Sequence, residues 1–483
     1  PGYGFLAENA EFARECEKAG IKFIGPKSDI LDMMGDKLSA KEMALTCNVP
    51  TIPGTEKPLS GKEEAEKLAA EFGFPVILKA AAGGGGRGMR RCDSIEEVGV
   101  NFELVKAEAK KAFGNDDIFM EKFLVEPKHI EVQILGDEHG NIVHLYERDC
   151  SLQRRFQKVV EFTPAFSLPP EVKQSILDDS LKLAKHVNYN AGTLEFLVDR
   201  GGNHYFIEMN PRIQVEHTIT EMCTGIDLVR SQILVAEGYE LSDEMIGIKS
   251  QEDIKQNGYA IQCRVTTEDP SNNFAPDTGK ITSYFSPGGF GVRLDGATSG
   301  VGSVISPYYD SLLVKITCWD NTFKNACKKT LRAIQEIRIS GVKTNIGFIS
   351  NILTNPTFIE GKCHTKFIDE TPELFNLDNG EDKSTKMLKY IATKTLAESG
   401  HHKRYDEILM PELTGNKPDG LKQLLDSKGP KAVADWVKDQ KKLLICDTTT
   451  RDAHQSLLAT RMRSKDIVAA MDATSEIESN VFS

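Results

Sequence analysis

The alternation of apolar and polar positions divides the chain into short helical and strand-like segments. Residues 11–19 have the spacing of an amphipathic helix that Gly20 ends, and the apolar run at 21–25 predicts a short strand. Residues 60–113 predict the order helix, strand, loop, strand, helix. The first hundred residues therefore predict one αβ unit followed by a small α/β module.

Strand-like runs dominate residues 118–217, and a polar helix near 170–187 interrupts them. This pattern predicts a mixed sheet. A further α+β stretch, with a helix around 322–337, continues to about residue 369. Residues 376–430 are rich in lysine and aspartate and prone to turns, which is typical of a connector.

A glycine pair between two strand-like runs places two glutamates opposite each other. Counting outward from a two-residue turn at Gly201 and Gly202 sets Glu195 opposite Glu208. Directly opposed carboxylates destabilise a sheet, so the pair needs a counter-charge, and a hard divalent cation with oxygen ligands supplies one. The alternative is a solvent-exposed hairpin, because a register slip of one residue would separate the two side chains.

Further polar residues complete this candidate metal site. Period-two alternation places Asn210 and Arg212 on the face of Glu208, so a carbonyl ligand and a cation flank the metal. Glu216 follows Arg212 by four residues, and such a pair of cation and base suits proton abstraction. A strand histidine, His129, is by itself more often a structural residue than a ligand.

Residues 83–89 form a glycine-rich loop between two strand-like runs. Gly83, Gly85 and Gly88 have GxGxxG spacing, but the loop leads into a strand instead of a helix and lacks the ending of a P-loop. A glycine hairpin that covers phosphates fits better, with Lys79 as a cation for the phosphate oxygens. The alternative is a mobile surface hairpin.

Polar residues also cluster where the apolar run at 443–446 ends. Such density at 447–455 is typical of the active-site end of the first strand in a (β/α)8 barrel. A helix that begins with an N-cap at Thr450 explains the same residues equally well.

Composition excludes several classes of protein. A length of 483 residues suits about three domains, and 40% apolar with 27% charged residues is ordinary for a globular protein. No apolar run approaches the ~18 residues of a membrane span, and a net charge of −12 argues against nucleic-acid binding. The ten cysteines are scattered without a CxxC pair, which indicates reduced thiols. The chain starts at Pro1, so we expect a fragment in which any targeting segment would have been lost.

Motif after motif over residues 1–370 resembles the biotin carboxylase component of biotin-dependent carboxylases, an ATP-grasp fold. The matching segments include KAAAGGGGRGM, ERDCSLQRR, FIEMNPRIQVEHTITE and SPYYDSLLVKI. The tail, with FIDETPELF and DTTTRDAHQSLLATR, is similar to the pyruvate carboxylase family, in which a carboxyltransferase domain follows on the same chain. The resemblance implies α/β and α+β architecture, with the ATP-grasp biotin carboxylase fold followed by the first strand of a truncated TIM barrel.

The resemblance also implies an order of domains. We expect a remnant of the N-terminal biotin carboxylase subdomain at 1–35, the ATP-grasp domain with its glycine-rich lid at 36–217, the biotin carboxylase C-terminal subdomain at 218–375, a connector at 376–440 and the start of the pyruvate carboxyltransferase domain at 441–483.

Site residues carried over by position come only from this resemblance. It implies nucleotide contacts from Lys37, Lys79, Gly85, Gly86, Glu121, Leu124, His129 and Gln153. It implies metal ligands at Glu195, Glu208 and Asn210, and bicarbonate contacts from Lys158, Arg212 and Val215. Glu216 matches the base that deprotonates bicarbonate, and Arg293 matches the residue that stabilises the biotin enolate.

In the tail, Asp452 matches a ligand of the carboxyltransferase metal, with Arg451 and Gln455 near pyruvate. One position departs from the family pattern. Phe156 stands where the family usually has histidine, and phenylalanine cannot hydrogen-bond a ribose hydroxyl.

The implied activity is the ATP- and bicarbonate-dependent carboxylation of biotin, as the first half-reaction in the conversion of pyruvate to oxaloacetate. The expected cofactors are Mg²⁺ or Mn²⁺, ATP, biotin on a carrier domain that this chain lacks, and a divalent metal in the carboxyltransferase domain. The expected partners are that biotinyl carrier domain, acetyl-CoA as an activator and further copies of the chain in a tetramer, with neither nucleic acid nor a membrane. The expected location is the cytoplasm, or the mitochondrial matrix in a eukaryote. Two alternatives stay open: the biotin carboxylase of an acyl-CoA carboxylase, and an inactive nucleotide-binding fragment.

Overall fold

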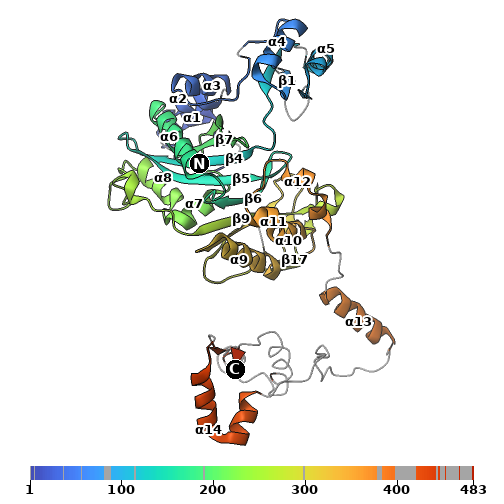
Figure 1. The fold of residues 1–483 in the computed structure, drawn as a ribbon. Helices are drawn as coiled ribbons and strands as arrows, with labels where there is room; N and C mark the ends of the chain where they lie inside the picture. The colour runs from blue at the N-terminus through green and yellow to red at the C-terminus, as the bar shows by residue number, and fades with distance from the viewer. Residues whose placement is uncertain are drawn as a thin grey trace. The chain divides into compact units, whose positions relative to one another are not determined.

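The structure is a computed structural model that divides into two compact units, Pro1–Asn379 and Gly380–Ser483 (Figure 1). The described residues are 2–4, 6–35, 37–55, 57–80, 89–113, 116–188, 191–296, 300–377, 383–397, 420–441, 444–446, 452, 467 and 481–482. The predicted glycine-rich loop at 83–88 lies outside them.

An eight-stranded sheet in the order β14-β16-β9-β6-β5-β4-β7-β8 forms the centre of the first unit. In chain order its strands are β4 (Lys128–Gly136), β5 (Ile142–Arg154), β6 (Gln157–Thr163), β7 (Ala191–Val198), β8 (His204–Asn210), β9 (Tyr259–Thr266), β14 (Val292–Gly296) and β16 (Leu312–Asp320). Each pair of neighbours is antiparallel, so the predicted mixed sheet is wrong. Short turns join β4 to β5, β5 to β6 and β7 to β8, and such connections produce antiparallel pairs.

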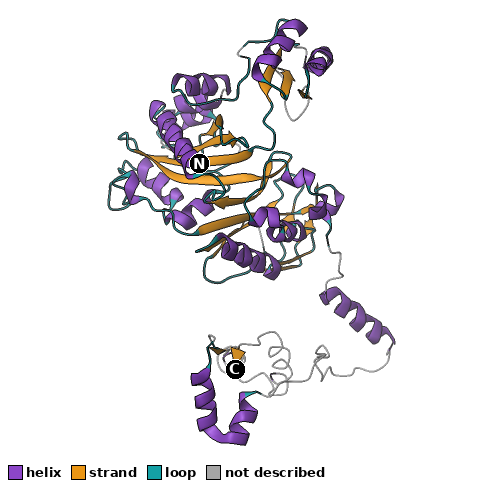
Figure 2. Ribbon diagram, viewed as in Figure 1, coloured by secondary structure: helices purple, strands orange, loops and turns teal. Residues whose placement is uncertain are grey.

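One face of this sheet is apolar and is covered by helices (Figure 2). Helix α6 (Pro170–His186) packs on β4 and β5, and α9 (Phe323–Glu336) packs on β9 and β16. Alternate strand residues supply the apolar face, such as Ile130 and Val132 on β4 and Ile261 and Cys263 on β9. The intervening residues of the same strands therefore point to the opposite face, where α7 (His217–Thr224) contacts β5, β6, β9 and β16.

A small α/β module precedes the large sheet and has its own apolar core. Its elements are α4 (Lys62–Phe72), β1 (Val76–Ala80), β2 (Met89–Cys92), α5 (Ile95–Phe113) and β3 (Ile118–Lys122), and the sheet order is β2-β1-β3. The predicted order of helix, strand, loop, strand and helix is confirmed.

The chain starts with the helices α1 (Ala10–Lys18), α2 (Ser28–Gly35) and α3 (Lys37–Thr46). The strand predicted at 21–25 is absent, because a strand needs a neighbour and none among the described residues pairs with this run. The remaining elements of the first unit are α8 (Leu228–Ala236), β10 (Glu268–Asp269), β11 (Ala275–Pro276), β12 (Gly279–Lys280), β13 (Ser283–Phe285), β15 (Val304–Ile305), β17 (Arg338–Ser340), α10 (Ile346–Thr354), α11 (Pro356–Ile359), α12 (Phe367–Glu370) and three short 3₁₀ turns.

The second unit contains two helices, α13 (Lys383–Ala397) and α14 (Leu421–Asp439), in its described part. Strand β18 (Ile445–Cys446) pairs in parallel with β19 (Val481–Phe482). Across the described residues of both units, every helix is too short or too polar to cross a membrane.

Candidate active site

The face of the large sheet opposite α6 and α9 is lined by buried polar side chains. They include His129, Glu131 and Gln133 on β4, Thr193 and Glu195 on β7, Gln262 on β9, and Lys315 and Thr317 on β16. Buried polar groups are costly unless they are paired. Their concentration on one face therefore indicates a functional site, where polar side chains are kept for their chemistry and not for the stability of the core.

Lys158, near the start of β6, lies at the centre of three carboxylates. Its ammonium contacts Glu131, lies 3.1 Å from Glu195 Oε1 and 2.7 Å from Glu216 Oε1. Burial alone would lower the pKa of Lys158, but the negative charges of Glu216 and Glu195 outweigh it and raise that pKa. Lys158 is therefore a fixed cation.

Glu216 follows β8 and precedes α7, and a second cation, Arg264 on β9, holds it. Arg264 Nη2 lies 2.9 Å from Glu216 Oε2, and Arg264 Nε lies 2.5 Å from Glu161 Oε1. Burial would raise the pKa of Glu216, but Lys158 and Arg264 hold it well below its ordinary value. Burial raises the pKa of Glu161 on the same guanidinium, so the two carboxyl groups differ in their affinity for a proton.

Glu195 is surrounded by three further polar side chains in addition to Lys158. Its oxygens lie 2.8 Å from His129 Nε2, 2.9 Å from Asn210 Nδ2 and 2.8 Å from Gln214 Nε2. Gln153 Nε2 in turn lies 2.5 Å from His129 Nδ1, so Gln153 donates to Nδ1 and the ring proton of His129 is on Nε2, which is buried near Glu195 without a hydrogen-bond partner among the described residues. The predicted nucleotide residues His129 and Gln153 are thereby joined to the predicted metal ligand.

The opposition of Glu195 and Glu208 is confirmed, but the predicted turn is wrong. The hairpin loop has three residues, 200–202, because Asp199 pairs with Asn203. That loop shifts the ladder by one residue from the predicted register. A bulge at Ile207 inserts one extra residue and restores the pairing of Glu195 with Glu208 beyond it.

These residues fit a hard divalent cation. Glu195 and Glu208 offer carboxylate oxygens on neighbouring strands, and Asn210 adds an amide that already bonds to Glu195. The ligand atoms of His129, Glu131 and Glu195 also lie within 4.8 Å of one another, and all three residues are buried. Cationic side chains neutralise part of the negative charge of these carboxylates, as a bound metal ion would.

The nucleotide residues predicted on the small module lie close together where they are described. Lys79 on β1 forms an ion pair with Glu121 on β3, and Leu124 follows that strand. The side chain of Lys37 and both Gly85 and Gly86 lie outside the described residues.

Arg212 does not pair with Glu216, contrary to the prediction. Its Nε lies 3.0 Å from Glu8 Oε2, and its Nη2 lies 3.3 Å from Asn210 Oδ1. Glu216 takes its cations from Lys158 and Arg264 instead, because β6 and β9 are neighbours in the sheet. The backbone oxygen of Val215 accepts a hydrogen bond from Lys315 at 3.0 Å.

Arg293 lies with a different group of residues from those that bind Lys158. It forms ion pairs with Glu221 and Asp295, and it lines a surface hollow together with Gly225 and Arg230. The structure therefore does not bring the predicted enolate-stabilising arginine to the carboxylates of the site. In the tail, Asp452 is described, whereas Arg451 and Gln455 lie outside the described residues.

Phe156 occupies a tight turn between β5 and β6. It has a φ of +65° and its side chain is 81% exposed. The departure from the family pattern thus falls on a surface turn.

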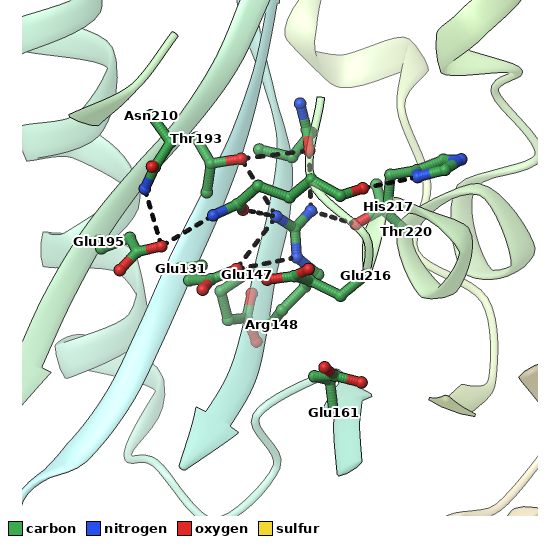
Figure 3. A network of polar contacts seen from close by, with 12 residues as sticks. Glu131, Glu147, Arg148, Glu161, Thr193, Glu195, Asn210, Glu216, His217 and Thr220 are labelled. Carbon is green, nitrogen blue, oxygen red and sulfur yellow. Dashed lines mark hydrogen bonds and ion pairs between the residues drawn. The ribbon is translucent and has the colours of Figure 1, made fainter. Parts of the chain in front are cut away.

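Sequence reasoning gave no role to Arg264, Glu161, Gln214 or Arg148. Period-two alternation on β9 gives Gln262 and Arg264 one face, but it does not say which strand lies beside β6. Figure 3 shows Arg148 in the middle of the polar network, between Glu131, Thr193 and Thr220.

Three family models match the first unit. They are the biotin carboxylase N-terminal domain at residues 1–31, the ATP binding domain of the carbamoyl-phosphate synthase L chain at 36–244 and the biotin carboxylase C-terminal domain at 262–370. Pyruvate carboxylases of Aspergillus terreus and Bacillus subtilis are each 53% identical over all of this chain. The chain spans 42% and 43% of their lengths, respectively.

Solved structures agree with these matches. The biotin carboxylase subunit of a pyruvate carboxylase is 50% identical with a TM-score of 0.69, over 78% of this chain and 82% of that chain. The biotin carboxylase domain of Hydrogenobacter thermophilus 2-oxoglutarate carboxylase, solved with MgADP, ADP and bicarbonate, is 49% identical with a TM-score of 0.69 and the same coverage. Rhizobium etli pyruvate carboxylase, solved with the allosteric activator acetyl coenzyme A, is 47% identical with a TM-score of 0.73, over 97% of this chain and 44% of that chain.

Proposed function

Because the chain belongs to the biotin carboxylase family of ATP-grasp ligases, we propose that it carboxylates biotin with ATP and bicarbonate in a pyruvate carboxylase. The observation that supports this most directly is Glu216, an ionised carboxylate held between Lys158 and Arg264 beside the opposed pair of Glu195 and Glu208. The 53% identity with whole-chain relatives that are pyruvate carboxylases supports the choice of acceptor.

Glu216 is the base in this proposal. Glu216 is ionised at neutral pH and therefore has a lone pair for the proton of bicarbonate, although the cations that lower its pKa also weaken it as a base. Lys158, Arg212 and the region of Val215 would attract the negative charge of bicarbonate. The freed oxygen attacks the γ-phosphorus of ATP, ADP leaves, and carboxyphosphate forms. Carboxyphosphate then releases carbon dioxide, the phosphate takes the proton from biotin N1, and N1 attacks the carbon dioxide to form carboxybiotin. Arg293 is the proposed stabiliser of the biotin enolate that this proton transfer produces.

The nucleotide would lie between the small module and the large sheet. It would contact the residues of both that the family resemblance assigns to it. Lys79, Glu121 and Leu124 come from the module, and His129 and Gln153 come from β4 and β5. Glu195, Glu208 and Asn210 would hold Mg²⁺ or Mn²⁺, which when bound neutralises charge on the transferring phosphate. Lys37, Gly85 and Gly86 are further proposed nucleotide residues.

The test is ATP hydrolysis by the complete protein that carries this chain, with and without bicarbonate and free biotin. We expect hydrolysis to require both bicarbonate and Mg²⁺, and Glu216→Gln to reduce the rate by ~10² to 10⁴-fold. Hydrolysis that ignores bicarbonate would contradict the proposal, and no hydrolysis at all would favour an inactive nucleotide-binding module.

The acceptor is a separate proposal, because a 2-oxoglutarate carboxylase is about as similar over the first unit as a pyruvate carboxylase is. Residues 441–483 would begin the carboxyltransferase barrel, with Asp452 as a metal ligand and Arg451 and Gln455 near pyruvate. The parallel pair β18 and β19 supports this, since a βαβ unit requires parallel strands. Carboxylation of pyruvate, with 2-oxoglutarate and an acyl-CoA as competing acceptors, tests the assignment.

The remaining proposals concern the whole protein. They are a biotinyl carrier domain as partner, a homotetramer, activation by acetyl-CoA, which is the allosteric activator of the Rhizobium etli pyruvate carboxylase, and a location in the cytoplasm or mitochondrial matrix. The domain boundaries at 35, 217, 375 and 440 are also proposals.

A further inference from the structure

Arg148 on β5 is a fully buried cation that the proposed mechanism does not use. Its Nη1 lies 2.8 Å from Gln133 Oε1 and 3.1 Å from Thr220 Oγ1. Its other donors reach Glu131 Oε2 at 3.2 Å, Thr193 Oγ1 at 3.1 Å and Gln214 Oε1 at 2.7 Å. Figure 3 shows this guanidinium between Glu131 of β4, Thr193 of β7 and Thr220 of α7.

The chemistry of Arg148 fixes the orientation of the amide of Gln214. A guanidinium has five donors and no acceptor, so the Gln214 atom at 2.7 Å must be the amide oxygen. The amide nitrogen must then face the other way, where it lies 2.8 Å from Glu195 Oε1. If Gln214 were rotated, its NH₂ group would face the guanidinium and its oxygen would face a carboxylate, and both contacts would be repulsive.

Gln133 provides an internal comparison. Arg148 orients its amide in the same way, through Gln133 Oε1. The Nε2 group of Gln133, however, donates to the backbone oxygens of Ile134 and Gly192 and not to a residue of the site. Two glutamines therefore share one guanidinium, and only one of them passes its orientation on to Glu195.

We propose that Arg148 is a positioning residue that directs the amide donor of Gln214 at the Glu195 carboxylate. This inference rests on the proposed function. Arg148 acts through Gln214 and touches no substrate. Lysine cannot replace it, because a single ammonium cannot present the planar fork that reaches Glu131, Gln133 and Gln214 together.

The test compares two matched substitutions in the complete protein. In Gln214→Glu and in Gln133→Glu an acceptor still faces Arg148, but the amide donor is lost. We expect Gln214→Glu to lower kcat/KM for bicarbonate by ~10-fold or more, since it places an unmatched oxygen against a buried carboxylate. Gln133→Glu should change kcat/KM by less than about twofold, although both variants lower the thermal midpoint.

A double-mutant cycle separates positioning from mere stability. Arg148→Lys should lower kcat/KM for bicarbonate in the wild-type background but add little in the Gln214→Glu background, because the relay is already broken there. If the losses of kcat/KM in Arg148→Lys and Gln214→Glu multiply in the double variant, the inference is overturned. Equal losses of kcat/KM in Gln133→Glu and Gln214→Glu would also overturn it. If Arg148→Lys does not fold, the two glutamine variants decide alone. If the wild-type protein shows no bicarbonate-dependent ATP hydrolysis, the proposed function is refuted instead. In that case the affinity for MgADP, measured by calorimetry, would still report whether Gln214→Glu alters the Glu195 side of the site.

Discussion

At the scale of single residues, the ionised state of Glu216 makes the free energy of unfolding depend on pH. Lys158 and Arg264 hold its folded pKa below that of an unfolded glutamate, which is about 4.3. A group with a depressed folded pKa stabilises the fold above the unfolded pKa, and this contribution is lost as the pH falls towards the folded pKa.

We therefore expect the free energy of unfolding to fall as the pH is lowered from about 6 to 3, and to fall less steeply in Glu216→Gln. Urea titrations at several pH values measure both slopes. Glu63→Gln, on the exposed first turn of α4, is the control and should follow the wild type. Parallel curves for Glu216→Gln and the wild type would show that Glu216 titrates normally.

Arg264 and Arg293 are the two arginines whose roles the structure separates. Arg264 contacts Glu216, whereas Arg293 contacts Glu221 and Asp295. We expect Arg264→Met to reduce bicarbonate- and biotin-dependent ATP hydrolysis by ~100-fold or more, because it leaves Glu216 and Glu161 short of a buried counter-charge. Without free biotin, Arg293→Met should have a much smaller effect than Arg264→Met on bicarbonate-dependent ATP hydrolysis, because the proposed partner of Arg293 is the biotin enolate. A larger loss in Arg293→Met than in Arg264→Met under these conditions would contradict this separation of roles.

At the scale of elements, alternation predicted most strands of the large sheet and the helices at 170–187 and 322–337. It could not give the order of the strands, because strands that are neighbours in the sheet, such as β6 and β9, are distant in sequence. That is why Glu216 was predicted to pair with Arg212, and why Arg264 was missed. The contacts of the buried Arg148 were missed for the same reason, since its partners lie on β4, β7, α7 and the loop that precedes α7.

The β7–β8 hairpin shows how a correct pair came from an incorrect turn. The sequence predicted a two-residue turn, and the structure has a three-residue loop whose offset the bulge at Ile207 cancels. A bulge has no simple sequence signature, whereas the opposed glutamates do.

Inserting one glycine after Ile207 should therefore remove the metal site while leaving the loop intact. With this added residue, Glu208 would move one position along the ladder, from Glu195 to Leu194, and its side chain would point to the other face. We expect weaker Mn²⁺ binding by about tenfold or more, measured by titration followed by electron paramagnetic resonance. Inserting one glycine within 200–202, on the loop side of the bulge, is the control and should preserve Mn²⁺ affinity. Equal binding by the variant with the glycine after Ile207 would contradict the role given to the register of Glu195 and Glu208.

At the scale of the whole molecule, the division at residues 379 and 380 lies close to the predicted boundary at 375 between the biotin carboxylase part and the connector. The three family models all lie within the first unit. Every described residue of the proposed nucleotide site and of the Glu195–Glu208 metal site also lies in that unit, whereas Asp452, the proposed carboxyltransferase metal ligand, lies in the second unit. Ligands of the first half-reaction should accordingly stabilise one unit and not the other.

Scanning calorimetry with and without MgADP tests this separation. Ligand at about 100 times its Kd stabilises the folded state that binds it by ~2.7 kcal/mol. We expect the thermal transition of the first unit to rise by a few degrees while that of Gly380–Ser483 stays unchanged, since all the residues proposed to bind MgADP belong to the first unit. ADP without Mg²⁺, and MgADP with Glu208→Gln, should each give a smaller rise, because the opposed carboxylates are what the metal would bridge. A single transition that shifts as one would mean that the two units unfold together, and the nucleotide would then stabilise Gly380–Ser483 through its coupling to the first unit.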